Sequence, residues 1–255
     1  MAYETVLISE KPYCLIVTIH RPQARNSINS TLLQEINEVL DRAEHDTQCR
    51  LVIFQGSNGI FCTGMDFFEA VAGKPMDNSV YMSTLKRFTL TSKVIISKLD
   101  GQVLAGGLGL AAASDLVIAT KHTQFNLPEA MWGLLPANVL PYLIRRVGFQ
   151  KAYEMVLTMQ TVSAEEAHRI HLVDTIAEDL DETIRRLMLR LIRVDVETII
   201  EMKNYFRKMW IISAEMEHLA IEQFARLLEK DRVQKNIRNF VEKQIFPWED
   251  EQKNK

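Results

Sequence analysis

A glycine-rich segment, VLAGGLGLAAASD at residues 103–115, is the stretch of this sequence that most invites a chemical interpretation. It is compatible with a phosphate-binding turn, with part of a membrane span or with the mouth of an active site. The phosphate interpretation is disfavoured, because neither the G-x-G-x-x-G spacing nor the lysine of a P-loop is present. The membrane interpretation is rejected, because the apolar run ends at Ser114-Asp115, well short of a span. The segment therefore favours an active site, but it contains no catalytic acid or base before Asp115.

The composition excludes several other kinds of chemistry. The 255 residues are 47% hydrophobic and 25% charged, as in an ordinary globular protein, and the net charge of −3 does not indicate a nucleic-acid partner. Three cysteines without C-x-x-C spacing and six histidines without metal-like spacing predict neither a disulfide framework nor a metal centre. We therefore expect a cytoplasmic protein. The N-terminus, MAYETVLISEKPY, has no long apolar core, so we expect no signal peptide there.

Strands and helices are expected to alternate as far as about residue 130, which predicts an α/β layered fold. We expect a helix capped by Ser30 or Thr31, a second helix over residues 79–97, and a strand-to-helix turn at the glycine-rich segment. The predicted strands lie in TVLISE, YCLIVTIH, RLVIFQG, KVIISKLDGQVLA, DLVIAT and TQFNLPE.

From residue 137 onward the pattern is helical. A capping box is predicted, in which Ser163 accepts from the amide of Glu166 and Glu166 reaches back. The prediction is a core over residues 1–195 and a helical region over 196–255. Apolar stripes in the helical region fit equally well with cover for its own core or with packing on a neighbouring subunit. The end of the chain, FPWEDEQKNK, is interpreted as an aromatic plug followed by a charged tail.

Four motifs, IFCTGMDF, GQVLAGGLGLAAASDLVIAT, FNLPEAMWGLLP and VSAEEAHRIHLVD, resemble in order and spacing the crotonase (enoyl-CoA hydratase/isomerase) superfamily. The N-terminal HRPQARNSIN fits as well, so the resemblance covers nearly the whole chain. It implies a spiral of ββα turns with a C-terminal helical region and a homotrimer or hexamer. It also implies a thioester substrate on coenzyme A or an acyl carrier protein, with no cofactor. AGGLGL, GLLPANVLPYLIRRVGFQKA and FPWED are similar to one branch, the dehydratases of polyketide β-branching cassettes.

The resemblance implies an oxyanion hole made of two backbone amides, those of Met65 and Gly106. Removal of a proton from C2 of a thioester places negative charge on the carbonyl oxygen, and two fixed N–H donors stabilise that charge. The first glycine of the family's triad is replaced here by Ala105. Asp66, which follows Met65, is expected to cap the next helix rather than to act in catalysis.

The resemblance also locates the missing carboxylate. Hydratases of the superfamily carry two glutamates, and the first position is occupied here by Gly109, whereas the second is Glu129 in FNLPE. A single carboxylate can take the C2 proton and return it to a hydroxyl that leaves from the same face. We therefore expect Glu129 to serve as base and then as acid.

Other residues are candidates for substrate binding. Asn138 is expected either to bind the substrate hydroxyl or to fix a turn. Tyr81 and Lys86 lie on the helix that the resemblance places over the pocket, where a cation would suit a distal carboxylate, although lysine on a helix usually faces water. Arg145 and Arg146 could meet an acidic carrier protein or the acids of a neighbouring helix.

The leading functional hypothesis is a dehydratase that converts 3-hydroxy-3-methylglutaryl-acyl carrier protein to 3-methylglutaconyl-acyl carrier protein. An enoyl-thioester isomerase is the first alternative, because one glutamate suffices to move a proton between C2 and C4. A glutaconyl-thioester decarboxylase and a non-catalytic protein that binds acyl carriers are the others. No nucleic-acid or membrane partner is expected.

Overall fold

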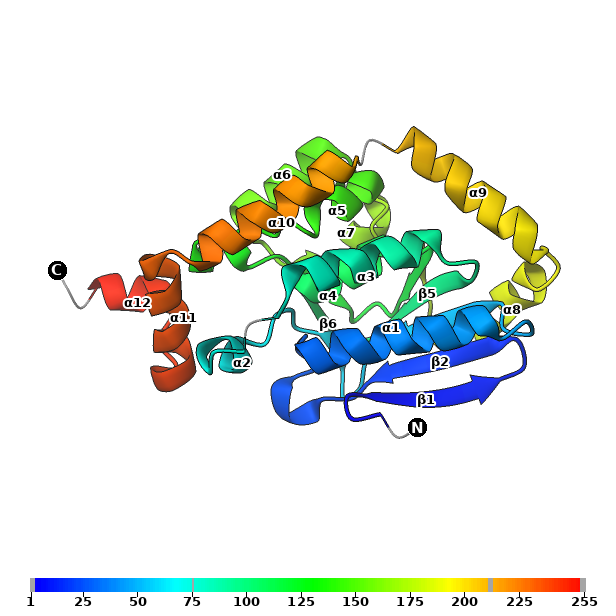
Figure 1. The fold of residues 1–255 in the computed structure, drawn as a ribbon, viewed down its shortest axis with the longest axis horizontal. Coiled ribbons are helices and arrows are strands. Elements are labelled where there is room, and N and C mark those ends of the chain that lie inside the picture. The colour runs from blue at the N-terminus through cyan, green and yellow to red at the C-terminus, as the bar shows by residue number, and fades with distance from the viewer. Residues whose placement is uncertain (1–2, 75, 211–212, 253–255) are drawn as a thin grey trace.

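The computed structural model describes residues 3–74, 76–210 and 213–252 and contains two sheets (Figure 1). The larger sheet has the order β1-β2-β3-β5-β7-β10, with β1 antiparallel to β2 and the later neighbours parallel. The smaller sheet has the order β4-β6-β8-β9. The strands of the larger sheet are β1 Val6–Lys11, β2 Cys14–Ile19, β3 Leu51–Gln55, β5 Val94–Leu99, β7 Leu116–Ala119 and β10 Thr175–Ile176. Those of the smaller sheet are β4 Ile60–Cys62, β6 Gln102–Leu104, β8 Gln124–Asn126 and β9 Val162–Ser163.

The chain builds these sheets by a repeated turn. Each repeat adds one strand to the larger sheet, one strand to the smaller sheet and then helix: β3, β4 and α2–α3; β5, β6 and α4; β7, β8 and the 3-10 helix η2. The predicted spiral of ββα turns is confirmed. The helices are α1 Ser30–His45, α2 Phe67–Val71, α3 Asn78–Leu90, α4 Gly106–Ala113, α5 Leu140–Val147, α6 Phe149–Thr158, α7 Ala164–Arg169 and α8 Leu180–Leu191. They are followed by α9 Val196–Met209, α10 Ala214–Leu228, α11 Asp231–Lys243 and α12 Pro247–Gln252, and the 3-10 helices are η1 Pro22–Ala24 and η2 Glu129–Trp132.

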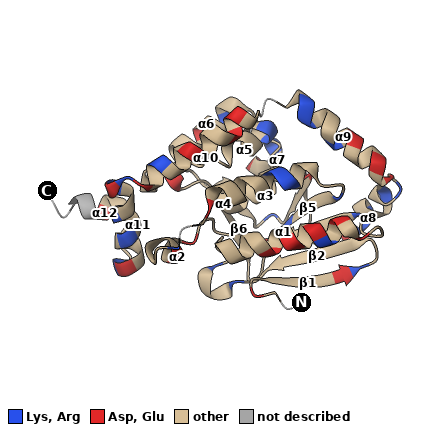
Figure 2. Ribbon diagram, viewed as in Figure 1, with Lys and Arg blue, Asp and Glu red and all other residues tan. Residues whose placement is uncertain are grey.

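The central strands β3, β5 and β7 of the larger sheet are buried on both faces, which explains why they are almost continuous apolar runs, whereas the edge strand β1 is largely exposed. Along β3, Val52 and Phe54 join the main core with α1 and α3, whereas Leu51 and Ile53 face a second cluster that includes residues of α8 and α9. Acidic and basic residues occur together on the outer helices (Figure 2), which agrees with the mixed charge of the sequence. None of the helices in the described residues is long and apolar enough to cross a membrane.

Two local predictions need correction. The helix expected over residues 79–97 ends at Leu90, because Glu44 accepts from the Ser92 amide at 2.8 Å and the β-branched run of β5 pairs with β3. The cap of α1 is Asn29, whose Oδ1 accepts from the Leu32 amide at 2.9 Å, and not Ser30 or Thr31.

Of the two hydrogen bonds predicted for the capping box, the structure contains one. Ser163 accepts from the Glu166 amide at 3.2 Å. The Glu166 carboxylate does not reach back along the turn, because it pairs with Arg169 and with Lys151 on α6.

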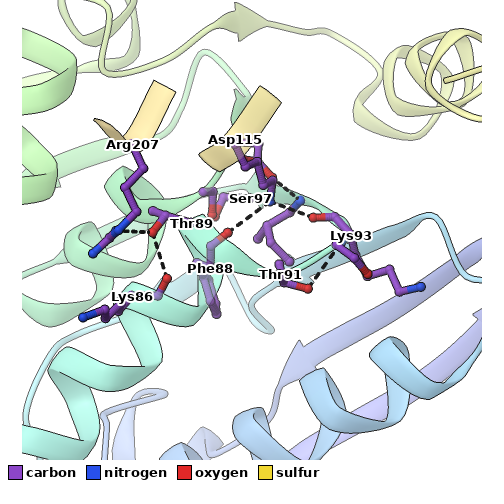
Figure 3. A network of polar contacts seen from close by, with 12 residues as sticks. Lys86, Phe88, Thr89, Thr91, Lys93, Ser97, Asp115 and Arg207 are labelled. Carbon is purple, nitrogen blue, oxygen red and sulfur yellow. Dashed lines mark hydrogen bonds and ion pairs between the residues drawn. The ribbon is translucent and has the colours of Figure 1, made fainter. Parts of the chain in front are cut away.

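The first of the C-terminal helices, α9, is anchored to the core by Lys203. The ammonium of Lys203 on α9 lies 2.6 Å from Asp115 and donates to the carbonyl oxygens of Phe88 and Lys93, at 3.2 and 2.7 Å. Figure 3 labels Phe88, Lys93 and Asp115, the three residues that Lys203 contacts, and Arg207, which donates to the Thr89 hydroxyl. From here α10 passes over α3 and leads to α11 and α12 at the other side of the molecule (Figure 1). The predicted domain boundary at residue 195/196 falls between α8 and α9.

Helix α4 packs so closely on its neighbours that a glycine is required at position 109. A Cβ atom built at Gly109 would lie 2.1 Å from the phenolic oxygen of Tyr81 and 2.9 Å from Cγ2 of Val139. The Tyr81 hydroxyl occupies that space and donates to the carbonyl oxygen of Gly106 at 2.6 Å. Tyr81 therefore holds the first turn of α4 in place. Its hydroxyl also fills the space that a longer side chain at position 109 would need.

This packing predicts a coupled pair of substitutions. Gly109→Ala should destabilise the protein despite alanine's better helix propensity, whereas the same change in a Tyr81→Phe background should cost less, because the colliding oxygen is gone. We expect a coupling free energy of about 1–2 kcal/mol in a double-mutant cycle measured by urea unfolding. Additive effects of the two substitutions would contradict this account of Gly109.

Candidate active site

A mostly apolar cavity of about 470 Å³ lies beside the first turn of α4. The described residues around it come mainly from the loop after β2, the loop after β4, the starts of α3 and α4, η2, the turn before α5, and helices α10 and α11 with Phe246 after them. The apolar part of the lining includes Ile28, Phe67, Met76, Met131, Trp132, Leu134, Phe224, Phe240 and Phe246. Such a cavity, with few polar groups, is typical of a small-molecule site.

One wall carries the amide of Met65, and a parallel bridge explains why this amide is free. The Ile28 amide donates to the carbonyl oxygen of Gly64 at 2.7 Å, and the Asp66 amide donates to that of Ile28 at 2.9 Å. The residue between the two contacts therefore turns its own N–H away from Ile28. Among the described residues, nothing accepts from the Met65 amide.

Asp66 holds this loop in place. Its carboxylate accepts from the amides of Phe68 and Glu69, at 3.0 and 3.2 Å, and so caps α2 as expected. The same carboxylate lies 3.0 Å from Arg21 and accepts from the Ser27 hydroxyl at 3.0 Å. Asp66 is thus committed to the fold.

The second free amide is that of Gly106, the first residue of α4. An N–H in the first turn of a helix has no acceptor within the helix, and no other acceptor for it is found in the part of the chain that the structure describes. A Cβ atom built at Gly64 would lie 3.1 Å from the Gly106 nitrogen, so the two segments that carry the amides are in contact. The turn between β6 and α4 requires φ 49° and ψ −123° at Ala105, a conformation that favours glycine.

Glu129 is a second buried acid of the cavity and, unlike Asp66, it is not paired with any described residue. It begins η2, is 7% exposed, and its Oε2 has no hydrogen-bond partner among the described residues. Burial raises the pKa of the Glu129 carboxyl from 4.5 to about 8. An unpaired carboxyl group of this kind is a better candidate for proton transfer than for holding the fold together.

Tyr81 and Asn138 line the same cavity, but Lys86 does not. The Lys86 ammonium lies 2.7 Å from Glu217, which also binds Arg207. Lys86 lies five positions after Tyr81, which places the two side chains about 140° apart around α3. Arg25, near the outer part of the loop after β2, is the one cationic side chain among the described residues that line the cavity.

Arg145 and Arg146 are committed to the far end of α4. They donate to the carbonyl oxygens of Ala112 and Ser114, at 2.6 Å from Arg145 and 2.7 Å from Arg146. Arg146 also lies 3.0 Å from Asp174. Cations at the C-terminus of a helix stabilise its free carbonyl groups, so both arginines have a structural role at this end of α4.

The structure adds residues to the site that sequence reasoning missed. Phe240 of α11 and Phe246 contact Trp132, with ring centroids 5.1 and 6.0 Å apart, so the C-terminal helices close one side of the cavity. The aromatic residues of the predicted plug were the only signal for this role. Asn78, at the start of α3, also lines the cavity, and nothing in the sequence distinguished it from an ordinary helix-start residue.

Among the described residues, no group of three or more His, Cys, Asp and Glu side chains is placed to hold a metal ion. The groups that the site offers are two backbone N–H donors, the buried and unpaired carboxyl group of Glu129, the cationic side chain of Arg25 and a few neutral polar side chains, whereas the Asp66 carboxylate is already paired with Arg21 and Ser27. This set can bind a carbonyl oxygen, stabilise negative charge on it and move a proton nearby.

Comparison with known proteins agrees with this geometry. A family model described as enoyl-CoA hydratase/isomerase matches residues 11–252. The bacillaene synthase dehydratase PksH of Bacillus subtilis is 33% identical over 257 residues, which cover 98% of this chain and 99% of PksH. The enoyl-CoA hydratase EchA19 of Mycobacterium tuberculosis is 30% identical over 182 residues, 68% of each chain.

The structural comparison gives the same result. The crystal structure of the Bacillus subtilis pksH protein superposes with a TM-score of 0.92 at 31% identity, covering 96% of this chain and all of that one (100%). An enoyl-CoA hydratase from Mycobacterium avium superposes with a TM-score of 0.83 at 26% identity, covering 96% and 98%. The resemblance inferred from the motifs is confirmed for the superfamily and for its polyketide branch. The chain belongs to the enoyl-CoA hydratase/isomerase family of enzymes.

Proposed function

We propose that this protein is a dehydratase of polyketide β-branching, which converts 3-hydroxy-3-methylglutaryl-acyl carrier protein to 3-methylglutaconyl-acyl carrier protein. The observation that carries the proposal is one buried, unpaired carboxyl group, that of Glu129, in the same cavity as the free amides of Met65 and Gly106. The similarity to PksH, which is named a dehydratase of bacillaene synthesis, supports both the reaction and the polyketide setting.

In the proposed reaction, the thioester carbonyl oxygen accepts hydrogen bonds from the Met65 and Gly106 amides. The Glu129 carboxylate removes the C2 proton, and the electron pair of the C2–H bond moves toward the carbonyl as an enolate. The C3–O bond then breaks while Glu129 returns the proton to the departing hydroxyl. The products are a C2=C3 double bond, one water molecule and an unprotonated Glu129, so the carboxylate is ready for another turnover.

The apolar lining supports this use of Glu129. A carboxylate whose pKa is raised holds a proton more firmly, so it is a stronger base toward C2 than an exposed glutamate is. Oxyanion donors also act more strongly where water is excluded. Losing one such donor costs roughly 3–4 kcal/mol of transition-state stabilisation in comparable sites.

An enoyl-thioester isomerase is the second candidate, because one carboxylate also suffices to move a proton from C4 to C2. The packing at Gly109 supports both candidates over a hydratase that depends on two glutamates, since the Tyr81 hydroxyl lies where a second carboxylate would begin. The buried carboxyl group of Glu129 speaks against a purely non-catalytic protein that binds acyl carriers. For a distal carboxylate on the substrate, we propose Arg25 as the partner in place of Lys86.

We also propose that the chain assembles as a homotrimer or hexamer through its C-terminal region. Helix α9 exposes a group of large apolar side chains: Met202, Tyr205, Phe206 and Met209. Exposed apolar patches of this kind often mark subunit interfaces.

Replacement of the buried acid tests the reaction. Glu129→Gln keeps the shape of the side chain but cannot accept the C2 proton, so turnover should fall by about 10²–10⁴-fold. The assay is mass spectrometry of a hydroxymethylglutaryl-loaded carrier protein, which follows the loss of one water molecule. Glu165→Gln, at an exposed position of α7, serves as the matched control and should remain active. Near-normal turnover in Glu129→Gln would remove the assignment.

The pH dependence of the wild-type enzyme is a separate prediction. The base form of Glu129 must be unprotonated, so kcat/KM should rise with pH through about 8. The pKa in the folded state exceeds the unfolded value of 4.5, so the folded protein binds more protons between these values and its stability falls as pH rises from about 4.5 to 8. Glu129→Gln should therefore gain stability over wild type, and the gain should be greatest above pH 8. A gain that is equal at pH 4 and pH 8.5 would argue against the raised pKa.

Light scattering after gel filtration tests the assembly. The particle should have three or six times the mass of one chain, and Phe206→Glu should shift it toward the monomer by placing charge on the apolar group of α9. Lys208→Glu, at an exposed position on the same helix, controls for charge alone. A wild-type protein that is monomeric at micromolar concentration would overturn the assembly proposal.

A further inference from the structure

Two asparagines in the wall of the cavity have side-chain oxygens without partners. Asn78 is 9% exposed and Asn138 is 3% exposed, and both line the cavity that holds Glu129. The Oδ1 atoms of both residues have no hydrogen-bond partner in the described part of the chain. Together with Oε2 of Glu129, they place three buried, unpartnered oxygens in residues of one cavity.

The two asparagines form a connected pair. Asn78 is the first residue of α3, and Asn138 lies in the turn before α5. The Asn138 amide group donates from Nδ2 to the main-chain carbonyl oxygen of Asn78 at 3.4 Å. This long contact turns the nitrogen of Asn138 toward the backbone and leaves its oxygen without a donor.

A buried asparagine outside the cavity, Asn26, has hydrogen-bond partners for both its side-chain oxygen and its nitrogen. Asn26 is 1% exposed, and its oxygen accepts from the Arg21 amide at 2.8 Å while its nitrogen donates to the Ile60 carbonyl at 2.7 Å. Buried polar groups are nearly always paired, since an unpaired one weakens the fold. The two unpaired asparagine oxygens in residues that line the cavity therefore indicate that they bind a ligand.

The chemistry of these oxygens selects the ligand group. An amide oxygen accepts hydrogen bonds, so the ligand must supply a donor. A carboxylate has no donor and would face two further acceptors, whereas a hydroxyl group donates through its hydrogen and keeps its lone pairs free.

We propose that Asn78 and Asn138 form a subsite that binds the 3-hydroxyl group of the acyl chain. The inference rests on the proposed function, in which that hydroxyl is the leaving group. The hydroxyl donates its one hydrogen to an oxygen of this asparagine pair, and a lone pair on the hydroxyl oxygen accepts the proton that Glu129 returns. The subsite thus orients the bond that breaks, while a distal carboxylate is placed elsewhere.

Binding measurements in the inactive Glu129→Gln background test the subsite without turnover. The probes are the pantetheine thioesters of 3-hydroxybutyrate and butyrate, which differ by the hydroxyl group, and of glutarate, which carries a distal carboxylate. Asn138→Leu and Asn78→Leu should each weaken 3-hydroxybutyryl binding by about tenfold and leave butyryl binding unchanged. Asn37→Leu, outside the cavity, is the control and should change neither.

Thermal unfolding separates this role from a structural one. Because the subsite oxygens are unpaired, Asn138→Leu and Asn78→Leu should keep or raise the melting temperature, whereas Asn26→Leu should lower it. Asn138→Ser and Asn78→Ser provide smaller replacements if a leucine variant does not fold. Equal weakening of 3-hydroxybutyryl and butyryl binding, no weakening of either, or a selective loss of glutaryl binding would each overturn the subsite.

Failure of the proposed function gives a different result. A wild-type enzyme that leaves the hydroxymethylglutaryl carrier unchanged refutes the dehydration. The selective loss of 3-hydroxybutyryl binding in the asparagine variants would still establish the hydroxyl subsite, since that measurement involves no reaction.

Discussion

Burial of an unpaired carboxyl group at Glu129 is the constraint on which the site depends. The surrounding cavity is apolar, and burial shifts the pKa of this group to about 8. A fold selected for stability alone would pair or replace such a group, because burial of a charge without a partner is costly. The two unpaired asparagines add to the same cost. The cavity therefore combines features that weaken the free protein and become favourable with a ligand in place.

Helix α4 is held rigidly at both ends so that the amide of Gly106 keeps its position. Tyr81 binds the Gly106 carbonyl at the N-terminal end, and Arg145 and Arg146 bind carbonyl oxygens at the C-terminal end. The other amide is held by the Ile28 bridge and by the cap of α2. Oxyanion stabilisation depends on donors that need not move during the reaction, so these contacts suit the role proposed for the two amides.

Much of the fold could be predicted from the sequence, because strand and helix patterns in the core are strong and the family motifs fix their order. The places of Glu129, Met65, Gly106 and Asn138 in one cavity followed from those motifs. The position of Lys86 outside the cavity could not be predicted, because it depends on a pairing with Glu217, which lies 131 positions away in the sequence. Asn78 could not be found either, since an unpaired oxygen becomes visible only when its surroundings are known. The end of α3 at Leu90 depended on Glu44, which reaches the following turn from α1.

In the proposed reaction, Glu129 removes a C2 proton from a thioester held by two backbone amides. The most direct measurement uses a saturated substrate analogue, 3-methylglutaryl-pantetheine, in D₂O, because this compound has no hydroxyl to lose. We expect the wild-type enzyme to exchange a single C2 proton for deuterium, detected by NMR, and the Glu129→Gln variant to show no exchange. An enzyme that dehydrates its substrate without any C2 exchange in the analogue, or a Glu129→Gln variant that exchanges at the wild-type rate, would contradict it.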